Sequence, residues 1–211
     1  MGVPVAVVTD CDVKQYEVDP STKQRQFKDK PKEAKAAVEH KQVLYGNADV
    51  KAFVSPKWTL EYCLAMSCLQ KLLIRAILFG KKVYNSDADP LSDNKAKAVE
   101  SEIVSEVSRI TAVQTKEEQA YEVYEMMLEN DGRSKLKAIL AHCLASLIRW
   151  EVSDIPQGYG YEHIFDYELL GISANEAKKS HLRQNIEDDP SLRYLVDAIR
   201  YACGLDPIQG D

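Results

Sequence analysis

The first half of the chain contains two short runs of mostly hydrophobic residues. One run, Val3–Val8, is rich in valine and ends at the polar Thr9. The other, Val50–Val54, is followed at once by Ser55 and Pro56. Short runs of β-branched residues between polar boundaries are typical of strands buried on both faces of a parallel sheet. We therefore expect the first run to form such a strand and the second run to form another strand.

Hydrophobic residues after position 59 recur instead at the 3.6-residue spacing of amphipathic helices. The first helix is expected to begin near Thr59 and to end at Gly80, because glycine is common at helix ends. Further helices are predicted around residues 99–110, 121–128, 136–147, 174–186 and 191–203. The residues expected to face inward in the last helix are Leu192, Leu195, Val196 and Ile199. Residues 153–171 are expected to form an ordered loop.

Between the two strands lies a polar stretch, residues 14–41, with eight Lys and Arg against five Asp and Glu. Its composition predicts a long surface loop that contains one short polar helix over residues 32–40. Loops of this length are often functional. The order of strand, long loop, strand and then mostly helices predicts an α/β fold. We expect an α/β core over residues 1–90 and a helical part over residues 91–211.

The net charge of the 211 residues is −6, but it is unevenly distributed. Residues 87–130 carry eleven acidic and four basic residues, whereas residues 14–41 are basic. A local basic patch can bind nucleic acid even when the whole chain is acidic. No apolar run is long enough to span a membrane and no signal-peptide pattern opens the chain. Five cysteines without CxxC spacing fit a reducing compartment, so we expect a cytoplasmic protein.

Two carboxylates, Asp10 and Asp12, directly follow the first predicted strand. Alternate residues of an extended segment point the same way, so both can face one cation. Their hard oxygen ligands suit Mg²⁺ or Mn²⁺. Such aspartates also cap turns, and the same pair occurs in some glycosyltransferases and in aspartate-based phosphatases. Lys14 stands where the phosphatase pattern has Thr or Val, which argues against that class.

Thr59 and Glu61 follow the second predicted strand in the same way. A hydroxyl or carboxylate at a helix start can cap free backbone amides as well as bind metal. The carboxyl ends of parallel strands meet at one edge of a sheet, where ligands collect. We therefore expect Thr59 and Glu61 to lie near Asp10 and Asp12.

Together these segments resemble a known family. Residues 5–12 (VAVVTDCD) and 50–65 (VKAFVSPKWTLEYCLA) are similar to the TOPRIM nuclease region of the overcoming-lysogenization-defect (OLD) family of ATP-dependent endonucleases. The Asp10–Asp12 pair matches the acidic pair of that region, and Thr59–Glu61 matches its hydroxyl-x-acid element. A helix with Lys137 followed by Ala141 and Leu144-Ala145, and the Pro-containing segment 189–199, also resemble the family.

The resemblance implies a TOPRIM-like parallel sheet flanked by helices, with a helical insertion and C-terminal helices that complete the core. It also implies DNA phosphodiester hydrolysis with two Mg²⁺ or Mn²⁺ ions. Asp10, Asp12 and Glu61 would hold metal, with Thr59 as a weaker ligand.

A lysine would stabilise negative charge in the transition state of that reaction. Lys137 fits the family spacing best, and Lys135 and Lys179 are the alternatives. The DNA itself would be bound through its phosphates by the basic stretch 14–41. A homodimer is an expectation from the family.

The chain also departs from the family. No Gly-rich phosphate loop is present, so ATP would act only through a missing ATPase domain or a separate ATPase subunit. No acidic residue precedes Asp10, although a TOPRIM core begins with a strand that carries a glutamate. We therefore expect a fragment or a partner-dependent nuclease that cleaves weakly or not at all alone. The alternative is a non-catalytic interaction module whose acidic helices in 87–130 dock on a partner.

Overall fold

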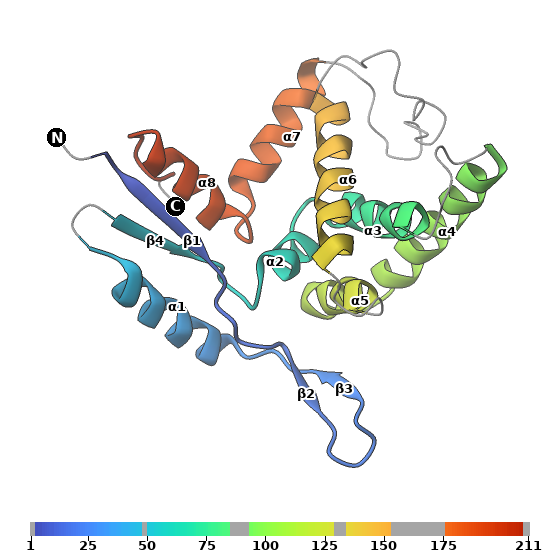
Figure 1. Ribbon diagram of the computed structural model, residues 1–211, viewed down its shortest axis with the longest axis horizontal. Coiled ribbons are helices and arrows are strands. Elements are labelled where there is room, and N and C mark those ends of the chain that lie inside the picture. The colour runs from blue at the N-terminus through green and yellow to red at the C-terminus, as the bar shows by residue number, and fades with distance from the viewer. Residues whose placement is uncertain (1–2, 48–49, 85–92, 129–133, 153–175, 209–211) are drawn as a thin grey trace.

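A computed structural model of the chain describes residues 3–47, 50–84, 93–128, 134–152 and 176–208 (Figure 1). These residues form a mixed α/β structure in which a small parallel sheet is flanked by helices. The loop expected over residues 153–171 lies outside the described residues. None of the described helices combines the length and apolar character that a membrane crossing needs.

Both predicted strands are present and pair in parallel. Strand β1 (Val5–Thr9) aligns with β4 (Val50–Val54), with Val5 opposite Val50 and Thr9 opposite Val54. Successive side chains of a strand point to opposite faces. On one face, Val54 packs near α1 (Pro31–Tyr45). On the other, Phe53 packs against α8 (Arg193–Ala202), the last described helix.

The expectation that the first strand is buried on both faces is wrong. Val5 and Val8 are 47% and 49% exposed, whereas Ala52, Phe53 and Val54 of β4 are buried. The difference arises because β4 packs against both α1 and α8, whereas the main helix contact of β1 is α8 alone.

The helix predicted over residues 32–40 is confirmed as part of α1, but the rest of the expected loop over residues 14–41 contains a hairpin. Strands β2 (Tyr16–Val18) and β3 (Arg25–Phe27) pair antiparallel, and the hairpin projects away from the sheet beside the start of α1 (Figure 1). Its turn is held by Asp19, whose carboxylate accepts hydrogen bonds from the amides of Ser21 and Thr22. Pro31 stands in the first turn of α1, where its missing N–H costs nothing.

The single helix expected from Thr59 to Gly80 is two helices, α2 (Leu60–Met66) and α3 (Gln70–Tyr84). The break is stabilised by Ser67, which ends α2, and by Asp189, whose carboxylate accepts a hydrogen bond from the amide of Cys68. Gly80 does not end α3 but lies inside it. A Cβ atom there would stand 2.9 Å from Leu140 of α6, so the glycine allows the two helices to pack closely.

The remaining predicted helices are confirmed. They are α4 (Asp93–Thr111), α5 (Lys116–Leu128), α6 (Ser134–Val152), α7 (Glu176–Asp188) and α8. The largest core lies among α2–α6 and draws residues from both sides of position 90. In α8 the expected inward residue Ile199 is 66% exposed, and Tyr194 and Ala198 face the sheet instead.

Candidate functional site

The two strand ends meet at one edge of the sheet, as the parallel pairing requires. The amide of Ser55, just after β4, donates to the carbonyl oxygen of Thr9 at 2.9 Å. Beyond the strands, the amide of Leu60 donates to Oδ1 of Asp10 at 2.8 Å. The carboxylate that follows β1 is therefore fixed against the first residue of the helix that follows β4.

Thr59 stands at the N-cap of α2. Its Oγ1 accepts a hydrogen bond from the amide of Tyr62 at 3.3 Å, and its backbone is extended. This is the capping role that the sequence left open beside metal binding. The hydroxyl oxygen keeps a second lone pair, so capping does not prevent Thr59 from being a weak ligand.

Asp12 does not continue the extended segment of β1. Its φ is +66°, a left-handed conformation, and its amide donates to the carbonyl of Trp58 at 2.8 Å. The expectation that Asp10 and Asp12 point the same way from an extended backbone is therefore wrong at Asp12. Its carboxylate pairs with Lys41 of α1, whose Nζ also donates to the carbonyl oxygen of Asp10 at 2.6 Å.

Glu61 and Lys137 are brought together from α2 and α6. Nζ of Lys137 lies 2.9 Å from Oε1 of Glu61, although the two residues are 76 positions apart. Both belong to the predicted site, and the fold places them within one ion pair. The side chains of the alternatives Lys135 and Lys179 lie outside the described part of the structure.

The carboxyl groups of Asp10 and Glu61 have opposite pKa shifts. Burial raises the pKa of Asp10, and the charges of Glu61 and Asp12 raise it further, against the hydrogen bond from Leu60. Burial also acts to raise the pKa of Glu61, but the hydrogen bond from Lys137 and further hydrogen bonds outweigh it and lower the pKa. Carboxyl groups whose environments separate their pKa values are common at functional sites.

Two tyrosines that the sequence analysis did not select lie close to these acids. Tyr194 of α8 is buried, its hydroxyl has no hydrogen-bond partner within the described residues, and burial and the charges of Cys63, Asp10 and Glu61 raise its pKa. Burial, followed by the charge of Glu61, raises the pKa of Tyr124 of α5. The sequence analysis likewise did not select Lys41 by itself and counted it only among the eight basic residues of the stretch 14–41.

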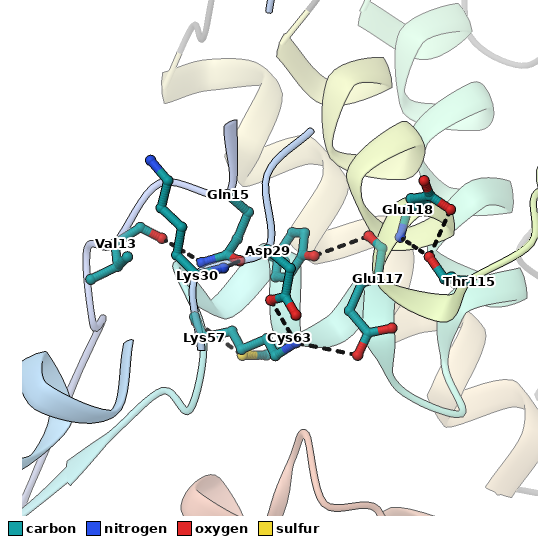
Figure 2. A network of polar contacts seen from close by, with 10 residues as sticks. Val13, Gln15, Asp29, Lys30, Lys57, Cys63, Thr115, Glu117 and Glu118 are labelled. Carbon is teal, nitrogen blue, oxygen red and sulfur yellow. Dashed lines mark hydrogen bonds and ion pairs between the residues drawn. The ribbon is translucent and has the colours of Figure 1, made fainter. Parts of the chain in front are cut away.

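A polar network holds the loop between β4 and α2 in place (Figure 2). Nζ of Lys57 lies 3.3 Å from Asp29, which follows the hairpin, and 3.2 Å from Glu117 at the start of α5. The hydroxyl of Tyr62 donates to the carbonyl of Glu117 at 3.0 Å, and Sγ of Cys63 donates to the carbonyl of Lys57. The helix start that carries Glu61 is thus tied to two other elements.

Asp10, Thr59 and Glu61 are the oxygen ligands at this edge that would hold a divalent cation. Within the described ranges, no group of three or more His, Cys, Asp or Glu side chains is arranged to hold a metal ion. Mg²⁺, however, is commonly bound by only one or two carboxylates and keeps several waters. Asp10 and Glu61 supply such a pair. The hydroxyl of Tyr194 is an orphaned buried group near them that a bound water could satisfy.

Comparisons of the chain with protein-family models, with curated proteins and with solved structures found no match. The likeness to OLD-family nucleases therefore stays a resemblance of short motifs, and the functional argument depends on the site itself.

Proposed function

We propose that the chain is a metal-dependent DNA endonuclease module that hydrolyses phosphodiester bonds with Mg²⁺ or Mn²⁺ and depends on a partner for full activity. The observation that carries this proposal is the convergence of Asp10, Glu61 and Lys137 from three elements far apart in sequence. The Leu60–Asp10 hydrogen bond and the Glu61–Lys137 ion pair fix that convergence.

In the proposed reaction, Asp10 and Glu61 hold the cation and Thr59 assists as a weaker ligand. A bound divalent cation supplies an activated water and neutralises charge on the phosphate. Lys137 stabilises the negative charge that grows on the phosphate oxygens. Its hydrogen bond to Glu61 raises the pKa of Lys137, so the ammonium stays protonated throughout.

The basic hairpin and α1 are the proposed DNA-binding surface. Lys23, Lys28, Lys32 and Lys35 all have exposed side chains in this region. Lys41 near the end of α1 pairs with Asp12, so α1 joins this surface to the turn that carries the carboxylates. Binding through phosphates weakens steeply as salt concentration rises, because it releases counterions. A salt-insensitive affinity would argue against DNA as the ligand.

The second candidate is a non-catalytic module that binds DNA or protein. The observation that favours it is the pairing of Asp12 with Lys41, which occupies a carboxylate that a two-cation site would need. In this case the acidic helices α4 and α5 would contact the partner.

The test compares wild type with Asp10→Asn in nicking of a supercoiled plasmid and in Mn²⁺ binding followed by electron paramagnetic resonance. Asp206→Asn, at an exposed residue, is the matched control. We expect Asp10→Asn to lose both activities and the control to keep both. Equal nicking by wild type and Asp10→Asn would overturn the nuclease proposal. Mn²⁺ binding without nicking would favour the second candidate.

A further inference from the structure

Lys41 is the most enclosed cation at the sheet edge. Its side chain is 18% exposed, and its Nζ is bonded both to the carbonyl oxygen of Asp10 and to the carboxylate of Asp12. These two oxygens belong to the same turn that carries the predicted metal ligands. The Lys41 ammonium therefore already binds two oxygen atoms of this turn.

The fold explains why Lys41 reaches this turn. Helix α1 packs on the sheet through Ala34, Ala37 and Val38. Residues three and four apart lie on one face of a helix, so Lys41 continues the face that carries Ala34 and Val38. Its side chain therefore extends along the sheet toward the end of β1 and not into solvent.

The contacts of Lys41 bear on how many cations the site can hold. An ammonium at the Asp12 carboxylate and a divalent cation at the same oxygens would repel each other. The ammonium has three N–H donors, and the two oxygens take two of them. The third is left for an additional acceptor, such as an oxygen of a phosphate group.

We propose that Lys41 supplies the second positive charge of the site in place of a second divalent cation, so that the site binds a single Mg²⁺ or Mn²⁺ at Asp10 and Glu61. The inference rests on the proposed function, and it differs from the two-cation expectation drawn from the family resemblance. A purely structural ion pair, which only holds the turn, is the alternative.

The test counts bound Mn²⁺ by calorimetric titration and electron paramagnetic resonance, without any activity assay. We expect wild type to bind one Mn²⁺, which Asp10→Asn abolishes and Asp12→Asn retains. Lys41→Met is expected to bind two, and the double variant Lys41→Met/Asp12→Asn one. Lys41→Arg keeps the charge and is expected to bind one.

The matched control is Arg109→Met, which removes another cation paired with acids, Glu106 and Glu122, away from the sheet edge. It is expected to bind one Mn²⁺. Lys41→Gln with a circular dichroism spectrum is the second variant if Lys41→Met does not fold.

Each result separates the two proposals. Two Mn²⁺ in wild type, or one in folded Lys41→Met and Lys41→Gln alike, would overturn the role of Lys41 while the metal site stands. No Mn²⁺ bound by wild type or by any variant would overturn the proposed metal-dependent function, and the role of Lys41 with it.

Discussion

Each of the two strand ends carries an acid paired with a lysine, but the two pairs are built in opposite ways. After β1, the Lys41 side chain is 18% exposed and that of its partner Asp12 is 69% exposed. After β4, the Lys137 side chain is 53% exposed and that of its partner Glu61 only 28%. In the first pair the lysine is the more buried partner, and in the second pair the glutamate is.

The difference in exposure indicates that the Lys41 charge is held in place, whereas the Lys137 charge is accessible to a ligand. The enclosed Lys41 ammonium is bonded to two oxygens of the turn and belongs to the framework of the site. The exposed Lys137 ammonium is free to turn from Glu61 toward an incoming phosphate. Lys137 is the more exposed of the two lysines, so it is the one proposed to move onto an incoming phosphate, whereas Lys41 is held in place.

The largest expected effect tests this division directly. Lys137→Met should lower plasmid nicking by about 100- to 1,000-fold, the range seen when one group that stabilises transition-state charge is removed. The number of Mn²⁺ ions bound should not change, because Asp10 and Glu61 remain. Lys71→Met, at an exposed lysine of α3, is the control. Equal losses in both variants would remove Lys137 from the mechanism.

A smaller effect tests the capping role at the β4 end. Thr59→Ala removes the oxygen that accepts the Tyr62 amide, and loss of such a cap costs about 1 kcal/mol. In a chain of this size that corresponds to a fall in Tm of roughly 2–4 °C. Thr59→Ser keeps the hydroxyl and should keep the Tm. An unchanged Tm in Thr59→Ala would show that the cap does not stabilise the fold.

Glu61→Gln should lower the Tm by less than the loss of the cap, because an exposed ion pair contributes roughly 0.2–1 kcal/mol. The pKa of Glu61 is lowered in the fold, after burial is outweighed by the hydrogen bond from Lys137. Its contribution is therefore present above the ordinary value of 4.5 and is lost as pH falls through the lowered pKa. Melting curves in EDTA should show a smaller Tm difference between wild type and Glu61→Gln at acid pH than at pH 7.

The smallest expected effect is a rise in Tm, whereas the two preceding substitutions lower it. Burial raises the pKa of Asp10, so its ionised carboxylate destabilises the fold above that pKa. In metal-free buffer at pH 7, Asp10→Asn should therefore raise the Tm slightly, and the gain should vanish below pH 3.8, the ordinary pKa of the group. A lower Tm in Asp10→Asn at pH 7 would contradict the direction of this shift.

Strongly patterned elements could be predicted from the sequence, and tertiary departures from the pattern could not. The two hydrophobic runs predicted β1 and β4, and the helical spacing of hydrophobic residues predicted α4 to α8. The hairpin was missed because each of its strands has only three residues in a polar stretch. The break between α2 and α3 was missed because the apolar spacing continues through it, whereas the bond that stabilises it comes from Asp189, 121 residues away.

In the site, too, some residues could be predicted from the local sequence pattern and others could not. Asp10, Thr59 and Glu61 could be selected because each follows a recognisable strand. Lys41 and Tyr194 could not, since their roles depend on how α1 and α8 dock on the sheet. Of the aliphatic residues predicted to face inward near α8, Leu192 is buried and Leu195 packs on the core, but Tyr194 packs on the sheet as well.

The covering of one sheet face by α8 has a consequence for how the protein is made. A ribosome completes β1 and β4 within the first 54 residues, but Phe53 is buried only when Tyr194 and Ala198 arrive, about 140 residues later. At roughly 5–20 residues per second, that delay is about 7–28 seconds of synthesis. During this interval Phe53 of the nascent sheet lacks the helix that covers it in the folded protein.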